Sequence, residues 1–81
     1  MQQKLVATLN MLAAEGIDVR IVPEDPKRIR LCVPRGDGEV SHSFTRTDDA
    51  MQWLQDQVRL HYSTAAYVRV KRFVCALTLE Q

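Results

Sequence analysis

Apolar residues recur at helical spacing at the start of the chain and alternate with polar residues in the segment that follows. Residues 2–15 have apolar side chains at intervals of three and four, which predicts a first helix. Gly16 follows directly and favours the end of that helix, because glycine readily adopts the conformation of a helix C-terminus. The expected core stripe is Leu5, Leu9, Leu12 and Ala13, with Val6 on its flank.

Three short runs then alternate between a mainly apolar and a mainly polar set of positions: residues 17–22, 28–33 and 40–45. A period of two predicts strands with one apolar face. Residues 23–26, bounded by two prolines, and residues 34–38 are expected to form the turns, with the Asp-Gly pair of the second turn favouring a tight hairpin. The pattern therefore predicts a three-stranded antiparallel meander.

A second helix is expected from Thr47, which can cap it, with Asp48 and Asp49 in the first turn offsetting the positive end of the helix dipole. Trp53 and Leu60 fall about 100–120° from the core stripe on a helical wheel and form a second apolar edge. If the tail of the chain covers that edge it is core, and if not it can anchor a protein interface. The core stripe itself comprises Ala50, Met51, Leu54, Val58 and Tyr62.

Residues 63–81 admit two interpretations. Their composition suits a strand, yet their apolar residues also form one helical stripe: Ala66, Tyr67, Val70, Phe73, Val74 and Leu77. Because Arg69 and Lys71 fall in one alternating set and Arg72 in the other, neither face of a strand would be cleanly apolar. We predict a third helix and keep a fourth strand as the alternative.

Together these elements predict a single α+β domain over residues 1–81, with the order helix, three strands, helix, helix and the helices packed on one face of the sheet. A domain of this length buries only ~60–65% of the surface that its unfolded chain exposes. We therefore expect marginal stability, or support from a partner or a second copy.

Charge and cysteine usage narrow the classes of function. Eleven basic and ten acidic residues give a net charge of +1, which excludes a polybasic nucleic-acid arm and an acidic mimic of DNA. Cys32 and Cys75 lie far apart and match no metal-ligand spacing, so we expect two reduced thiols, with a disulfide as the alternative. The sequence predicts no cofactor, no metal site and no membrane span, and a cytoplasmic location, in the host cell if a phage encodes the chain.

The polar side of the expected sheet is the first candidate for partner binding. Arg20, Arg28 and Arg30 should project from it, beside the hydroxyl residues of the third strand. Arginine is the planar, bidentate donor that interfaces favour, although an ordinary solvated face would look the same. The further candidate partner-binding residues are Trp53, Leu60, Arg69, Lys71 and Arg72.

The order of elements resembles the double-stranded-RNA-binding fold and the small HicA-like ribonuclease toxins, in which a strand histidine preceded by glycine performs the chemistry. Here Ser41 precedes His42, and His42 shares the inward parity of Val40 and Phe44, so we expect a partly buried core histidine. Ser41 and Ser43 should point to the opposite face, which disfavours a Ser–His couple. We therefore expect no catalytic residues and no enzyme, and keep a nucleic-acid-binding or toxin module as the alternative.

The passage from the predicted hairpin through residues 44–54 combines an alternating meander, a Thr-Asp helix start and a Trp-Leu pair. It resembles the strand-to-helix junction of small phage proteins, among them inhibitors of the type I CRISPR surveillance complex. The resemblance implies a non-enzymatic phage or mobile-element protein that binds a host protein or ribonucleoprotein assembly and occludes or adapts it. Direct nucleic-acid binding and a homodimer stay open.

Overall fold

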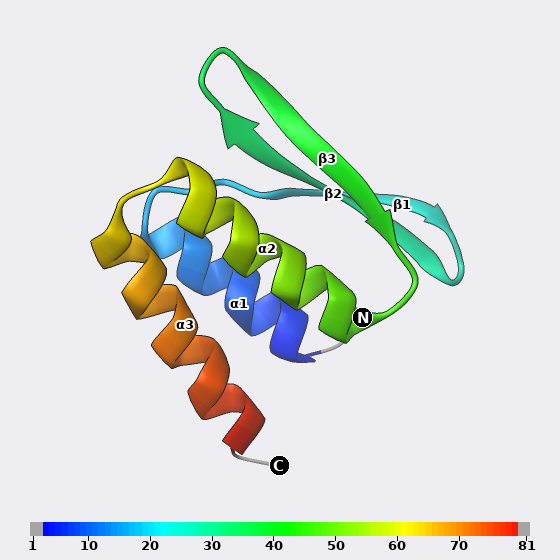
Figure 1. The fold of residues 1–81 in the computed structure, drawn as a ribbon. Helices are drawn as coiled ribbons and strands as arrows, with labels where there is room; N and C mark the ends of the chain where they lie inside the picture. The colour runs from blue at the N-terminus through cyan, green and yellow to red at the C-terminus, as the bar shows by residue number, and fades with distance from the viewer. Residues whose placement is uncertain (1–2, 80–81) are drawn as a thin grey trace.

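Three helices and three strands follow one another in the computed structural model, which describes residues 3–79 (Figure 1). The predicted α+β class and element order are confirmed, and the tail is a helix as far as residue 79. Residues 2, 80 and 81 of the predicted helices lie outside the described residues. In chain order the elements are α1 (Gln3–Ala14), β1 (Arg20–Asp25), β2 (Arg28–Arg35), β3 (Gly38–Phe44), α2 (Thr47–His61) and α3 (Thr64–Leu79).

The sheet is an antiparallel meander with β2 between the two edge strands β1 and β3. The β2–β3 turn is centred on Gly36 and Asp37, since Arg35 pairs with Gly38. Gly36 has φ +58°, which the first central residue of a type II′ turn requires. The tight hairpin thus lies within the predicted residues 34–38, but its central pair is Gly36 and Asp37 rather than Asp37 and Gly38, because Gly36 supplies the one positive φ that this turn needs.

Strand β1 begins three residues later than predicted and includes Pro23, which the sequence pattern assigned to a turn. Pro23 pairs with Ile29, and the register shifts between Pro23 and Asp25, which marks an irregularity in the strand. A proline is tolerated there because β1 is an edge strand, where one side of the backbone needs no ladder partner.

Gly16 ends α1 as predicted, and Ile17 closes the helix end instead of starting a strand. Gly16 has φ +82°, its N–H donates to the carbonyl of Ala13 at 3.0 Å, and the N–H of Ile17 donates to that of Leu12 at 2.9 Å. This pair of bonds is the Schellman motif, which usually adds an apolar contact from the residue after the glycine. Ile17 is accordingly buried in the core, with 1% of its surface exposed.

The two later helices begin differently from each other. Arg46, not Thr47, is the N-cap of α2, and it makes no side-chain capping bond; Asp48 and Asp49 lie in the first turn as predicted. Before α3, the hydroxyl of Ser63 accepts a hydrogen bond from the N–H of Ala66 at 3.1 Å, which satisfies one of the free N–H groups at a helix start.

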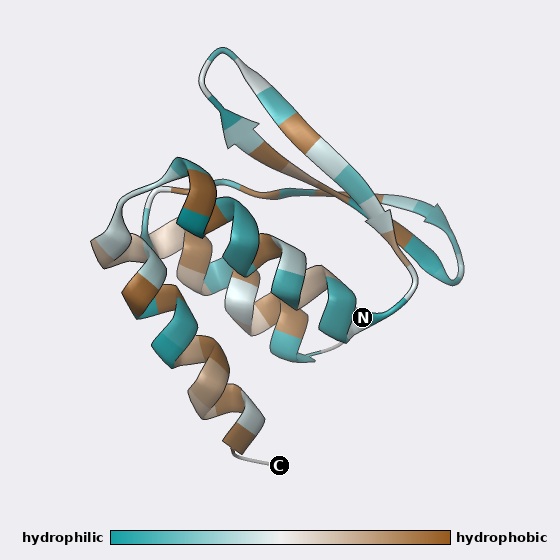
Figure 2. Cartoon of the chain, viewed as in Figure 1, coloured by the Kyte–Doolittle hydropathy of each residue, from teal (hydrophilic) through white to brown (hydrophobic). Residues whose placement is uncertain are grey.

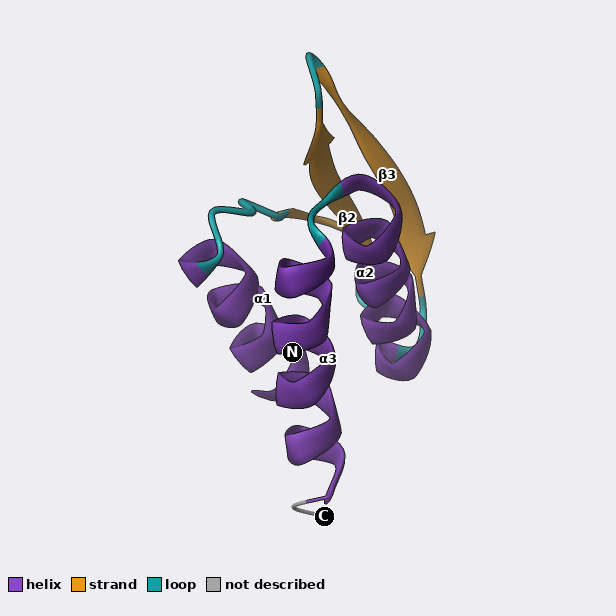
Figure 3. Ribbon diagram, turned by 60° about the vertical axis from the view of Figure 1, so that its left-hand side comes forward, coloured by secondary structure: helices purple, strands orange, loops and turns teal. Residues whose placement is uncertain are grey.

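The helices do not all pack on the sheet as predicted. α2 lies against β2 and β3, whereas α3 packs against α1 and α2 (Figure 3). The most hydrophobic strand is the central one, β2, which supplies Leu31 and Val33 to the core (Figure 2). Thr8 is also fully buried, and its hydroxyl donates to the carbonyl of Lys4 at 2.8 Å, while Ala13 is exposed. The core residues are Leu5, Leu12, Ile17, Leu31, Val33, Ala50, Met51, Leu54, Val58, Ala66, Val70 and Val74.

Tyr62, directly after α2, connects the helices to the C-terminal end of β2 by a hydrogen bond. Its hydroxyl donates a hydrogen bond to the carbonyl of Pro34 at 2.5 Å. β1 does not reach this point, because its first residue, Arg20, pairs with Cys32. None of the helices in the described part of the chain has the length and apolarity to cross a membrane.

Candidate functional site

The sheet face turned away from the helices, called the outer face, carries mostly polar side chains. The strand register places Arg20 opposite Cys32, and Arg30 opposite Ser43, so the two arginines share a face as the alternation predicts. No described helix packs over this face. The outer face is formed by Arg20, Glu24, Arg30, Cys32, Glu39, Ser41 and Ser43.

Glu24 is the centre of a hydrogen-bond network that crosses all three strands. Its carboxylate accepts hydrogen bonds from the hydroxyl of Ser43 at 2.6 Å and from Nε of Arg30 at 3.1 Å, and Arg30 also donates to the hydroxyl of Ser41 at 3.2 Å. The hydrogen bond from Ser43, followed by that from Arg30 and by the charges of Arg30 and Arg28, lowers the pKa of Glu24. The network therefore holds these side chains in one arrangement.

A second ion pair, between Arg20 and Glu39, spans the sheet from β1 to β3. The hydrogen bond with Glu39 raises the pKa of Arg20. Cys32 lies between these strands on β2 and is buried. The outer face is consequently a mixed face of paired charges rather than the basic patch that the three arginines suggested.

Arg28 differs from the other two arginines of the predicted patch. It is exposed at the start of β2, and among residues 3–79 it forms no ion pair. Its charge nevertheless contributes to the lowered pKa of Glu24. Arg28 is thus a cation at the edge of the outer face that remains available to a partner.

The second apolar edge of α2 is not covered by the tail. Trp53 is half-buried and lies in an aromatic cluster, with its ring centroid 5.4 Å from that of Phe44 and 6.2 Å from that of His42. The rings of His42 and Phe44 are 4.9 Å apart. Leu60 lies two turns further along α2 on the same side and is 58% exposed.

His42 is exposed, so the prediction of a partly buried core histidine was wrong. Its side chain has the inward parity of Leu31, its partner across the ladder, but β3 is an edge strand and nothing in the described chain packs beyond it. Ser41 and Ser43 lie on the outer face, bonded to Arg30 and Glu24, and therefore cannot activate or be activated by His42. Within residues 3–79, no three metal-ligating side chains gather.

The basic residues of the tail do not form one patch. Arg69 donates two hydrogen bonds of 2.6 Å to the carboxylate of Glu15 at the end of α1, which lowers the pKa of Glu15 and raises that of Arg69. Lys71 instead lies over the ring of Tyr67, with Nζ 5.9 Å from the ring centroid, and Arg72 is exposed. Arg69 therefore links α1 to α3. Its guanidinium is already bonded to Glu15, so a partner would have to share or replace that bond.

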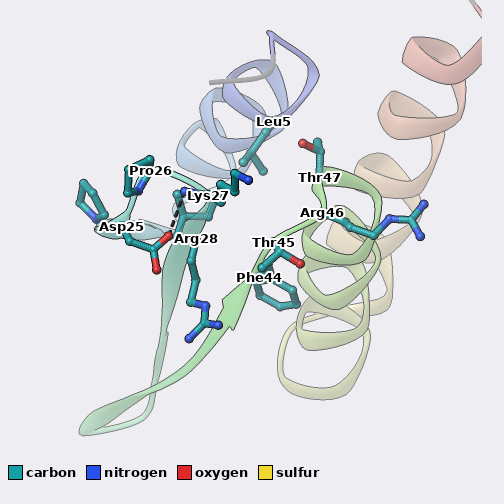
Figure 4. A pocket seen from close by; sticks show the side chains of 11 residues that line it. Leu5, Asp25, Pro26, Lys27, Arg28, Phe44, Thr45, Arg46 and Thr47 are labelled. Carbon is teal, nitrogen blue, oxygen red and sulfur yellow. Dashed lines mark hydrogen bonds between the residues drawn. The ribbon is translucent and has the colours of Figure 1, made fainter.

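A cleft of about 580 Å³ lies where the β1–β2 turn approaches the N-terminal ends of α1 and α2 (Figure 4). Leu5, Lys27, Phe44 and Thr47 line it, and Arg46, although near, points away from the turn in Figure 4. The backbone N–H of Lys27 donates to the carboxylate of Asp25 at 2.9 Å, which fixes the turn. No local sequence pattern predicts this cleft, because it is formed by three segments that lie far apart along the chain.

Both cysteines are free, Cys32 buried in the sheet and Cys75 exposed on α3, so the disulfide alternative is excluded. Comparison of the chain with models of protein families, with curated proteins and with solved structures gave no match.

Proposed function

We propose that this chain is a non-enzymatic binding protein that covers a surface of a larger protein or ribonucleoprotein assembly with the outer face of its sheet. The observation that carries the proposal is the network on Glu24 and the ion pair of Glu39, which fix charged side chains on a face that no described helix covers. Side chains that are already held in place lose less conformational entropy when a partner binds.

The chemistry of the face points to a partner surface that carries a carboxylate or phosphate opposite Arg28. Arg20 and Arg30 keep side-chain exposures of 59% and 42% despite their ion pairs, so each can share its remaining N–H donors with a partner. Charges at the rim of an interface mostly speed and orient the encounter. The partner should therefore associate more slowly when these charges are removed.

The type I CRISPR surveillance complex is the first assembly to test, because residues 44–54 resemble the strand-to-helix junction of its small phage inhibitors. The purified complex is mixed with the chain, and binding of the complex to its target DNA is measured. If the complex is not bound, affinity capture from a host lysate supplies the assembly for the measurements below.

The decisive variant replaces Arg20, Arg28 and Arg30 with alanine. We expect the association rate constant with the captured assembly to fall by roughly tenfold or more. Association rate constants of variants of one interface commonly differ by ~1–3 orders of magnitude. A control with Lys4, Arg46 and Arg59 replaced by alanine undergoes the same change in net charge, from +1 to −2, away from the outer face and from the other candidate residues. Equal binding by the folded outer-face variant and the parent would refute the proposal.

A salt titration distinguishes the alternative of nucleic-acid binding. If the three arginines contacted duplex phosphates, the logarithm of the binding constant would fall with the logarithm of salt concentration with a slope of about −2.7. A protein partner bound through a few rim charges should show a shallower slope and should remain bound after nuclease treatment.

A further inference from the structure

The free edge of β3 is regular and lacks the proline, lysine and bulge that commonly protect a sheet edge. β1, at the opposite edge, contains Pro23 and a register irregularity. β3 has no proline, lysine or arginine and no break in its pairing from Gly38 to Phe44, and the carboxylate of its Glu39 is already paired with Arg20. Natural sheets usually blunt an edge with proline, lysine, a bulge or a covering element, so an unprotected edge is a site for strand addition.

The register identifies which backbone groups are free. A two-residue turn makes its flanking residues a hydrogen-bonded pair, and bonded and non-bonded pairs then alternate along the ladder. Arg35 and Gly38 flank the turn, so Glu39, Ser41 and Ser43 direct their backbone groups away from β2. Pro34 fits this assignment, because it lies opposite Glu39 and has no N–H to donate. In the described residues no other backbone or side-chain group bonds to the N–H or carbonyl of these three positions.

We propose that two copies of this chain pair through antiparallel β3 strands, with the two-fold axis at Ser41, into one six-stranded sheet. Ser41 then faces Ser41 of the second copy, and Glu39 faces Ser43, so no like charges lie opposite each other. On the helix side Val40 faces His42, and Phe44 faces Gly38, where nothing lies within 4 Å of the position that a Cβ would occupy. The aromatic ring of Phe44 thus covers a glycine that has no side chain of its own.

The helices fit the same arrangement. α2 lies against both β2 and β3, so it sits about midway between them. Adjacent strands are ~4.8 Å apart, which places the α2 helices of the two copies ~10 Å from each other. That separation is the normal distance between packed helices, ~8–10 Å. The sides that meet carry Trp53 and Leu60, so the dimer buries the apolar edge that the monomer leaves exposed.

The inference does not rest on the proposed function, since the outer face stays open in the dimer. A second copy suits this edge better than an unrelated extended peptide does. The α2 helix of the second copy covers the apolar edge beside β3, whereas a lone strand would leave that edge in water. Failure of the dimer would leave the proposed function intact, and the reverse also holds.

The first test is the mass in solution, measured by analytical ultracentrifugation over a dilution series. We expect a species of twice the chain mass of 9.3 kDa that dissociates on dilution. A monomer at every concentration up to the solubility limit would overturn the proposal.

The second test fixes the register by disulfide trapping in a Cys32→Ala, Cys75→Ser background, because Cys32 lies directly opposite Ser41 on β2 and would otherwise pair with the introduced thiol. Directly opposed residues of a hydrogen-bonded pair have Cα atoms ~5.5 Å apart, within the range of ~4.4–6.8 Å that a disulfide spans. Ser41→Cys should therefore form a covalent dimer on mild oxidation. The matched control Ser43→Cys should stay monomeric on a non-reducing gel, because the two Ser43 positions are ~13 Å apart along the strands. Trapping by Ser43→Cys but not by Ser41→Cys would overturn the register.

A third test uses charge. Ser41→Lys places two ammonium groups opposite each other and should raise the dissociation constant of the dimer by roughly tenfold or more. Ser43→Lys adds the same charge opposite Glu39 of the second copy and should leave the dimer intact. If circular dichroism shows that a lysine variant does not fold, the disulfide test decides. An unchanged dimer in folded Ser41→Lys contradicts the proposed axis.

Discussion

Tyr62 supplies a hydrogen bond that the sheet itself leaves out. The carbonyl of Pro34 points toward the side of β2 where β1 has not yet begun, and the phenol hydroxyl takes the place of the missing strand. A buried carbonyl without a partner is costly, so this single bond lets β2 extend beyond its neighbour. The core pattern of α2 predicted that Tyr62 faces inward, but the period of a helix carries no information about which carbonyl its hydroxyl meets.

Tyr62→Phe should lower the free energy of unfolding by about 0.5–1.5 kcal/mol, because the ring stays packed while the hydrogen bond is lost. Urea titration followed by circular dichroism measures the change. Tyr67→Phe is the matched control and should be nearly neutral, since no hydrogen bond of its hydroxyl is formed within residues 3–79. Equal losses for the two variants would show that the bond to Pro34 contributes nothing.

At the scale of helices and strands, local signals predicted most of the fold and missed what depends on distant neighbours. Gly16 and the alternation of residues 28–33 were sufficient for the end of α1 and for β2, because both act through the local backbone. His42 was misjudged because parity gives the face of a strand, whereas burial depends on what packs beyond the edge. Shared strand parity also placed Arg20 and Arg30 together, but not their pairing with Glu39 and Glu24, since no sequence pattern encodes contacts between those positions.

The ion pair between Glu15 and Arg69 links the end of α1 to α3, and it should make this link sensitive to acid. Because the folded-state pKa of Glu15 lies below its unfolded value, the stabilisation is complete above the unfolded pKa and is lost as the pH falls through the folded pKa. Between about pH 7 and about pH 3, Glu15→Gln should therefore lose less unfolding free energy than the parent does. Thermal melts of the parent and of Glu15→Gln across this range measure the difference. An identical pH dependence in Glu15→Gln and the parent would show that this link adds no stability.

At the scale of the whole molecule, the Cα trace measures 37 × 35 × 17 Å, so the protein is a thin slab with one layer of core. Small domains have a low total stability of a few kcal/mol, and each fully buried side chain is a large part of it. The dimer proposed above would double the sheet without thickening the slab.

Leu12→Ala should lower the free energy of unfolding by about 2–5 kcal/mol, because Leu12 is fully buried and its removal leaves a cavity. Leu79→Ala makes the same chemical change at a position that is 85% exposed, and should have little effect. Urea titration of both variants measures the difference. A small loss of unfolding free energy for Leu12→Ala would mean that neighbouring side chains repack and fill the cavity.

The two free thiols lie in such different surroundings that they record different events. Cys75 is exposed on α3 and can react with an alkylating reagent without any opening of the fold, whereas Cys32 reacts only when the side chains that cover it on the outer face move aside. At high reagent concentration the modification of Cys32 proceeds at the rate of that movement. The unaltered chain thus reports the opening of its outer face through Cys32, with Cys75 as an internal standard.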